Sequence, residues 1–242
     1  MFRSYRILPY YFVFFILLLA CNDDDDSDNI PASACDETST PLYQEASSIL
    51  QVEFENATFT GDWVLVNDLS NATGAGFMQW EGDDSFGRPS DGLASFQIQI
   101  NNPGTYRFIW RSAVKEGDNP TEGNDTWLRF ADADDFFGEK NNGSIVYPNG
   151  TGKTPNPEGA SADGWFKIYR SGEPLDFKWQ ARTSDNDAHD VFVTFNSAGT
   201  YLMEISGRAK GHAIDKFVMF DRAVYTEDEA LAVNTFSTIS CN

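Results

Sequence analysis

The chain has few of the side chains that enzymes use to move protons or attack substrates. It has only two histidines, His189 and His212, and no Gly-x-Ser-x-Gly motif that would present a nucleophilic serine. No group of His and Cys has the spacing of a zinc site. Acidic pairs such as residues 83–84 and 134–135 are adjacent in the sequence. On a strand such neighbours point to opposite faces, so no local motif proposes a catalytic pair.

Composition limits the classes of partner. The 242 residues have a formal net charge of −20, which argues against nucleic acid, because Lys and Arg would have to neutralise the phosphates. About 14% of the residues are aromatic, including 20 Phe and 6 Trp, which is ample for one large hydrophobic core. We therefore expect a single folded domain over residues 35–242.

The elements that would position functional residues are short strands. Segments rich in Val, Ile, Phe, Tyr, Trp and Thr alternate with Gly, Pro, Asn and Asp, which is typical of an all-β sandwich. Alternation is clearest where Phe96, Ile98 and Ile100 share one face, and again where Val191, Val193 and Phe195 do. We predict strands at residues 50–55, 63–66, 75–81, 93–100, 104–111, 125–131, 164–169, 175–181, 190–196, 200–206 and 213–220.

Two segments differ from this pattern. Residues 226–233 have weak helical periodicity, and residues 131–164 are rich in Asp, Asn, Gly and Pro. Few of its residues can bury surface, and a structureless run of that length inside a compact domain is usually either functional or disordered. We expect it to be one long loop insertion in the sandwich.

The N-terminal segment has the features of a secretory signal. Arg3 and Arg6 precede an apolar run over residues 7–19, which is shorter than the roughly 20 residues that span a bilayer as a helix. The run ends in Leu-Ala before Cys21, which resembles the lipobox of bacterial lipoproteins. This resemblance implies that residues 1–20 are removed and that Cys21 carries the lipid. The alternative is an ordinary N-terminal anchor.

An acidic tether follows at residues 21–34. Its run Asn-Asp-Asp-Asp-Asp-Ser-Asp at residues 22–28 consists of like charges that repel one another and stay solvated. It resembles the export tag of surface lipoproteins in the Bacteroidetes group. The resemblance implies a lipid-anchored protein of the outer membrane that is exposed on the cell surface. The alternatives are a flexible spacer and the periplasmic face of that membrane.

The two remaining cysteines are expected to form a disulfide. With Cys21 acylated, Cys35 and Cys241 are left over in an oxidising compartment. A bridge between them requires the two ends of the domain to lie side by side.

Several motifs in a fixed order point to a family. They are Val-Glu-Phe-Glu-Asn-Ala at 52–57, Gly-Phe-Met-Gln-Trp at 76–80, Gly-Thr-Tyr at 104–106 leading to Arg111, and Gly-His-Ala-Ile-Asp-Lys-Phe-Val at 211–218. Together they resemble non-catalytic carbohydrate-binding modules of families 6 and 35. Those modules are β-sandwich jelly rolls, so the resemblance implies this fold and a polysaccharide ligand.

The same resemblance implies one structural Ca²⁺ between the first and last strands. Glu55 and Asp215 match the carboxylate ligands of the family, and Glu53 is a third candidate. On a strand Glu53 and Glu55 would face the same side, and Ca²⁺ prefers such hard oxygen ligands. The alternative is that these carboxylates are solvated or paired with Lys and Arg.

Sugar binding needs aromatic planes and polar groups. Trp80, Trp127, Trp165 and Trp179 are our candidates for exposed planes, while Trp63 and Trp110 fit core positions better. Around Trp127, Leu128 and Phe130 would face the core, which places Asp125 with Trp127 on the opposite face. The alternative is a core position, which is the more common one for any single Trp.

The loop before the last predicted strand supplies basic candidates. Arg208, Lys210 and His212, together with Arg111 and Arg182, could form a local basic patch. Such a patch would suit a carboxylated or sulfated glycan. The alternative is that these side chains pair with Asp and Glu. The family often has Asn where this chain has His212-Ala213, which puts its usual hydrogen bond to a sugar in doubt.

We therefore expect a lipid-anchored β-sandwich that captures polysaccharide at the cell surface, without cleaving it, for outer-membrane uptake or degradation proteins. One alternative is a jelly-roll polysaccharide lyase or glycoside hydrolase that uses His212, Arg208 and a tyrosine such as Tyr169. The other is an adhesion or scaffold subunit that contacts protein.

Overall fold

The computed structural model describes residues 35, 39–157 and 159–241. The expected signal peptide at 1–20, the tether at 21–34 and the lipid on Cys21 lie outside these residues and stay predictions. None of the helices in the described residues is long and apolar enough to cross a membrane.

One sheet is organised around its long central strand, β17. It pairs antiparallel with β7 along one edge, and with β5 and β2 in turn along the other. The sheet continues from β5 to β4, from β7 to β13 and β15, and from β15 through β9 to β10. Its strands are β2 (Ile49–Glu53), β4 (Trp63–Val66), β5 (Phe77–Trp80), β7 (Gly104–Val114), β9 (Asp135–Glu139), β10 (Ile145–Val146), β13 (Lys178–Trp179), β15 (His189–Phe195) and β17 (His212–Asp221).

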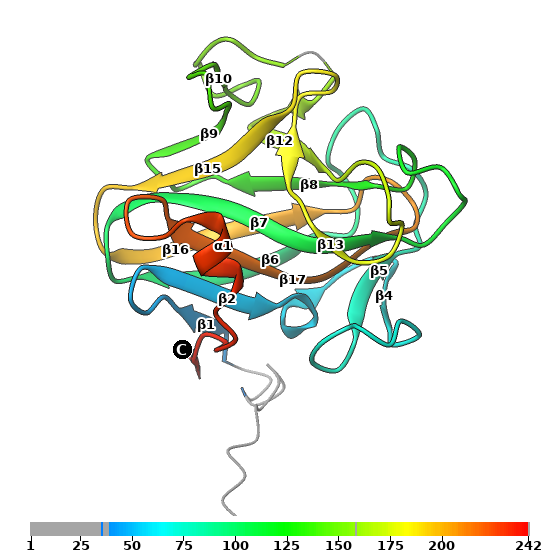
Figure 1. Ribbon diagram of the computed structural model, residues 1–242, viewed down its shortest axis with the longest axis horizontal. Coiled ribbons are helices and arrows are strands. Elements are labelled where there is room, and N and C mark those ends of the chain that lie inside the picture. Colours follow the sequence, from blue (N-terminus) through cyan, green and yellow to red (C-terminus); the bar gives the residue numbers. More distant parts are fainter. Residues whose placement is uncertain (1–34, 36–38, 158, 242) are drawn as a thin grey trace, which may run out of the picture.

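The second sheet runs in the order β18–β1–β6–β16–β8–β12, with β3 beside β6 and β11 beside β12. In Figure 1, β6 and β16 lie behind β7 and β17. Strand β14 pairs with β12 and with β15, so hydrogen bonds continue from one sheet into the other. The strands are β1 (Pro41–Gln44), β3 (Thr58–Phe59), β6 (Ala94–Ile100), β8 (Asp125–Phe130), β11 (Ser161–Ala162), β12 (Trp165–Tyr169), β14 (Arg182–Thr183), β16 (Gly199–Ser206) and β18 (Ile239–Cys241).

The core lies between the two sheets and follows the predicted alternation. Phe96, Ile98 and Ile100 of β6 are fully buried, and so are Val191, Val193 and Phe195 of β15. Aromatic rings from both sheets meet there; Phe96, for example, lies edge-on to Phe217 of β17. Trp63 and Trp110 are core residues, as expected. The prediction of an all-β sandwich is confirmed.

The structure differs from the prediction where strands are short or polar. The 131–164 segment contains β9, which pairs with β15 over five residues, so it is not a single loop. The tip beyond β10 is held by the Asn156 amide, which donates to the carbonyls of Tyr147, Pro148 and Lys153. The helix expected at 226–233 is shorter, α1 (Glu227–Leu231), and a Thr226–Glu229 capping box fixes its start.

The predicted disulfide is present. Cys35 and Cys241 are bonded with their Cα atoms 5.5 Å apart. Next to the bridge, β1 pairs antiparallel with β18, with Pro41 opposite Cys241. The two ends of the domain therefore lie side by side, as the bridge requires.

Replacing both cysteines of this bridge with serine should lower the free energy of unfolding by about 3–5 kcal/mol. The bridge joins residues 206 positions apart and so restricts the unfolded chain strongly in the loop-entropy account. Urea unfolding of the oxidised protein and the double variant would measure the difference. Reductant should destabilise the wild type and leave the double variant unaffected. Equal unfolding midpoints for the two proteins would contradict the prediction.

Candidate functional site

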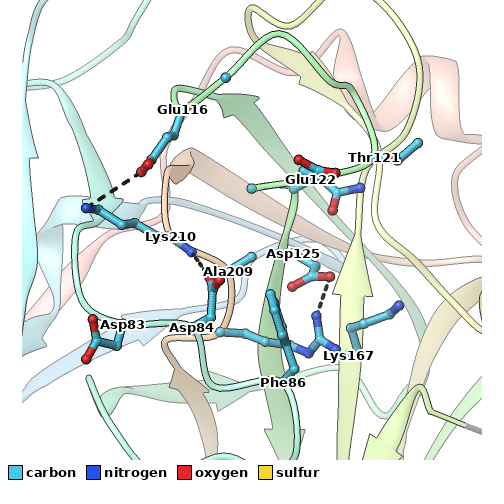
Figure 2. A pocket seen from close by; sticks show the side chains of 14 residues that line it. Asp83, Asp84, Phe86, Glu116, Thr121, Glu122, Asp125, Lys167, Ala209 and Lys210 are labelled. Carbon is cyan, nitrogen blue, oxygen red and sulfur yellow. Dashed lines mark hydrogen bonds and ion pairs between the residues drawn. The ribbon is translucent and has the colours of Figure 1, made fainter.

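A cleft of about 740 Å³ opens between three loops (Figure 2). These loops follow β5, connect β7 to β8, and connect β16 to β17, and the first residue of β8 lies at the base. The loop that leads into β17 contains Arg208 and Lys210, two of the ligand-binding candidates predicted from the sequence. The lining residues are Asp83, Asp84, Phe86, Glu116, Gly117, Thr121, Glu122, Gly123, Asn124, Asp125, Lys167, Arg208, Ala209 and Lys210.

A buried ion pair forms one part of the cleft wall. The Arg208 guanidinium lies 2.5 Å from Asp125 Oδ2, and both residues are more than nine-tenths buried. Burial raises the pKa of Asp125, and the charge of Arg208 opposes that rise. The second carboxylate oxygen of Asp125, Oδ1, is buried without a hydrogen-bond partner among the described residues. A buried acceptor without a partner is costly, so this oxygen is unused hydrogen-bonding capacity in the wall of the cleft.

The Arg208 guanidinium lies between two aromatic rings. Its Cζ is 4.9 Å from the centroid of Phe86 and 5.0 Å from that of Trp127. These cation–π contacts hold the guanidinium in place together with the ion pair. Phe86 itself is 54% exposed, and Figure 2 shows its ring standing in the cleft.

Sequence reasoning missed Phe86. It is a lone aromatic in the run Asp-Asp-Ser-Phe-Gly-Arg-Pro at residues 83–89, which has no strand periodicity. The residues around it could have indicated its role. A Gly-, Pro- and Asp-rich loop has no strand alternation that would turn an aromatic side chain toward the core. Loops supported by a rigid scaffold often carry binding residues.

The tryptophans do not form the expected exposed planes. Trp80, Trp127 and Trp165 are 1%, 1% and 4% exposed, so none of the three rings has a face open to a ligand. Trp127 does lie on the side of β8 opposite the core residues Leu128 and Phe130, but the loop after β5 covers it. The carbonyl of Ser85 in that loop accepts a hydrogen bond from Trp127 Nε1 at 2.9 Å. The Arg129 guanidinium lies over Trp165 at 4.5 Å.

Trp179 is the exception, because it is half-buried against the edge of the core. Its strand β13 lies beside β7, with Trp179 opposite Arg111. Lys216 Nζ is 6.0 Å from its ring centroid. Trp179 does not line the cleft, so the structure does not join it to Arg208 and Lys210.

The possible basic patch is not present. The expected members pair with acids: Arg208 with Asp125, Lys210 with Glu116 at 3.8 Å, Arg111 with Asp215 at 2.6 Å, and Arg182 with Asp190 at 3.6 Å. The cleft is lined by five carboxylates and three cations, so its formal charge is 3 − 5 = −2. These side chains instead pair with Asp and Glu, which is the alternative that the sequence left open.

His212 is a core residue and does not reach the cleft. Its ring is fully buried beside Trp110, and Nδ1 is 2.8 Å from Thr126 Oγ1. Burial lowers the pKa of His212 to about 3, so the ring is neutral at ordinary pH. Tyr169 is also buried, with its hydroxyl donating to the Ser184 carbonyl. The residues suggested for a lyase therefore do not converge on a solvent-accessible point.

The second histidine has a serine beside it, but the surroundings do not suit catalysis. His189 Nε2 lies 3.1 Å from Ser144 Oγ, while Nδ1 lies 2.5 Å from the Asp187 carbonyl. The nearest amides are already used, because Ser144 N donates to Asn142 Oδ1 and Gly143 N donates to the Lys140 carbonyl. They cannot serve as oxyanion donors, and Ser144 does not line the cleft.

The three candidate calcium ligands lie near one loop, Thr73–Ala75, but not as predicted. Strand β2 ends at Glu53, and Glu55 lies in the 3₁₀ turn Phe54–Asn56, so the two are not alternate residues of one strand. A Cβ added to Gly74 would lie 2.2 Å from Glu55 Oε1 and 3.1 Å from Glu53 Cδ. Both side chains therefore pack against this glycine.

These residues fit a cation in part. Glu53 Oε1 and Glu55 Oε2 are buried without partners among the described residues, and such oxygens suit Ca²⁺. Asp215 is fully buried, but Arg111 and the Thr73 amide already occupy its two oxygens. In the described part of the chain, no group of three or more His, Cys, Asp and Glu has metal-binding geometry. Arg111 thus takes the place of a cation at Asp215, while the two glutamates keep free oxygens.

Comparison with known proteins gives similarity in structure only. No family model matches the chain, and no curated protein matches its sequence. Similar solved structures include a Podospora anserina GH26-CBM35 β-(1,4)-mannanase (TM-score 0.42, 17% identity, 75% of this chain and 29% of that one). They also include a family 35 carbohydrate-binding module from Clostridium thermocellum (TM-score 0.40, 12% identity, 72% and 99%). A family 6 carbohydrate-binding module is a third (TM-score 0.39, 12% identity, 75% and 99%).

Modules of families 35 and 6 are thus among the solved structures to which the chain is similar. The chain spans less than a third of the mannanase. Because these structures are at most 17% identical to the chain, their similarity concerns the fold. The proposed function is argued from the residues of the cleft.

The two glutamates give a prediction for the pH dependence of stability. Burial, followed by the charge of Glu55, raises the pKa of Glu53 to about 8; burial raises the pKa of Glu55 to about 7. Because both values exceed the ordinary one near 4.5, these groups favour folding below about pH 4.5. That contribution is lost as the pH rises to about 8.

In chelator, the wild type should therefore lose stability between pH 5 and pH 8 relative to Glu53→Gln, as measured by thermal midpoints. Asp62→Asn, which changes an exposed acid, should retain the wild-type slope. A constant difference between the wild type and Glu53→Gln across this range would contradict the assignment.

Proposed function

We propose that this protein binds polysaccharide without cleaving it, and that the sugar chain lies in the cleft beside Phe86. The observation that carries the proposal is an exposed aromatic ring next to a buried carboxylate oxygen without a partner. The apolar face of a pyranose can stack on the ring, while a sugar hydroxyl can donate to Asp125 Oδ1.

The size and lining of the cleft support this proposal. A volume of about 740 Å³ falls within the usual range of ligand sites. The lining also includes Thr121, whose hydroxyl donates to Asn119 Oδ1 and can still accept a hydrogen bond from a hydroxyl-rich ligand. The burial of His212 and the pairing of Arg208 support binding rather than chemistry, since neither side chain is free to transfer a proton.

The structural Ca²⁺ inferred from the resemblance becomes a narrower proposal. Glu53 and Glu55 would hold the ion through their unpartnered oxygens, with neighbouring backbone carbonyls completing the set. Asp215 would not contact the ion, because it pairs with Arg111. A bound cation would offset the repulsion between the two buried carboxylates, and its role would be to fix the loop at Gly74.

The remaining parts of the proposal come from the sequence. A lipid on Cys21 would anchor the protein to the outer membrane, the acidic run after it would direct it to the cell surface, and captured glycan would pass to uptake or degradation proteins. These statements rest on the lipobox and on residues 22–28.

Phe86→Ala should weaken glycan binding about three- to tenfold, the range expected for the loss of one aromatic contact. Because the ring is exposed, the thermal midpoint should change little. Native gels cast with plant and marine polysaccharides would identify a ligand first, and titration calorimetry would then measure the affinity. Val224→Ala, which removes another exposed apolar side chain, is the matched control. Equal affinity for Phe86→Ala and wild type would place the sugar elsewhere.

The same gels test the class of function. Retardation without cleavage is the expected result. Release of new reducing ends or unsaturated products would favour a hydrolase or a lyase, and migration unaffected by every polysaccharide would favour a protein-contacting scaffold.

Chelator should lower the thermal midpoint of the wild type at pH 8, and added Ca²⁺ should restore it. Glu55→Gln should make the protein insensitive to both, because one of the proposed donors is lost. An identical wild-type midpoint with chelator and with Ca²⁺ would exclude the metal.

A further inference from the structure

The charges of the cleft bear on which polysaccharides it can accept, and this inference rests on the proposed function. Three cations line the cleft, and each already has an acidic partner. Arg208 pairs with Asp125, Lys210 with Glu116, and Lys167 with Asp185, which lies outside the lining. Lys210 is the exposed member, and its 3.8 Å pair with Glu116 offsets its charge, so the described lining has no surplus positive charge for an anionic ligand.

Several carboxylates of the lining are not compensated. Asp83 and Glu122 have no ion pair among the described residues, and both are exposed. Asp84 accepts a hydrogen bond from the Lys210 amide, which leaves its charge in place. Figure 2 shows Asp83 and Asp84 on one side of the cleft, with Phe86 near Asp84, and Glu122 on another side. A ligand that enters the cleft thus meets negative charge from more than one loop.

The charge of Arg208 is already compensated within the protein. Arginine recognises carboxylates and sulfates with two parallel N–H groups; in Arg208, Nη1 is held by Asp125, and Nε is buried without a partner among the described residues. Aromatic rings lie close to the guanidinium as well, and the residue is only 6% exposed. The group therefore orients Asp125 and leaves Oδ1 of that carboxylate as the acceptor.

We propose that the cleft is selective for uncharged polysaccharides and discriminates against carboxylated and sulfated ones. A neutral hydroxyl donates to Asp125 Oδ1, whereas a uronate carboxylate brings no proton and adds a charge of the same sign as the lining. Asp83 and Glu122 are the specificity-determining residues, because their charges are exposed at the opening and are not neutralised by a partner.

The test compares polymers that differ only in charge. Native polyuronates and their carboxyl-reduced forms share one backbone, so the pair isolates the carboxylate. We expect the wild type to bind a reduced or naturally neutral polymer about three- to tenfold more tightly than the carboxylated form at low salt. The ratio should shrink as salt is added, because screening weakens the repulsion.

Two variants assign the effect to the cleft. Asp83→Asn combined with Glu122→Gln should reduce the ratio between reduced and carboxylated polymer. Asp118→Asn changes an exposed acid of the same β7–β8 loop that does not line the cleft, and it should leave the ratio unchanged. Thermal midpoints of both variants would show that each remains folded.

The outcomes separate this inference from the function on which it rests. Tighter binding of the carboxylated form, or equal binding of both forms, overturns the selectivity and leaves polysaccharide binding intact. An unchanged ratio in the double variant overturns the assignment to Asp83 and Glu122. The absence of binding to every polymer overturns both the selectivity and the proposed function.

Discussion

The pairing of β17 along both of its edges is the constraint on which the rest of the structure depends. The register with β7 shifts between Ile214 and Lys216, and such irregularities redirect side chains. Ile214 and Phe217 can therefore both enter the core, while Asp215 between them turns to Arg111 and Thr73. The loop that leads into the same strand carries Arg208 and Lys210 to the cleft. One strand thus positions both the cleft wall and the buried carboxylate beside Glu53 and Glu55.

The features predictable from the sequence were those decided by local pattern or by elimination. Phe96, Ile98 and Ile100 alternate because one face of β6 is buried, and the sequence shows that period directly. The pairing of Cys35 with Cys241 was predicted by elimination, on the expectation that Cys21 carries a lipid and that the compartment is oxidising. Strand β9 was missed because it is short and its run Asp-Phe-Phe-Gly-Glu is interrupted by glycine, which weakens the strand signal.

The site was harder to predict because it depends on contacts between distant segments. Alternation correctly placed Trp127 away from the core, but could not show that Ser85 and Phe86, about 40 positions earlier, would cover it. Arg208 and Asp125 are 83 positions apart, so a basic loop in the sequence became a neutralised pair in the structure. The prediction that Glu55 shares one strand face with Glu53 was wrong for a local reason. Strand β2 ends two residues before Glu55, and the turn that follows breaks the period of two.

The bridge between Cys35 and Cys241 also has a mechanical consequence. A pull applied at residue 35 reaches β18 through the disulfide as well as β1 through the chain, because Cys35 is bonded to Cys241 at the end of β18 and β18 pairs with β1. Strand β1 runs parallel to β6, so tension along it loads several hydrogen bonds in shear together instead of opening them one after another. The end of the domain that would face an anchor is therefore built to resist tension.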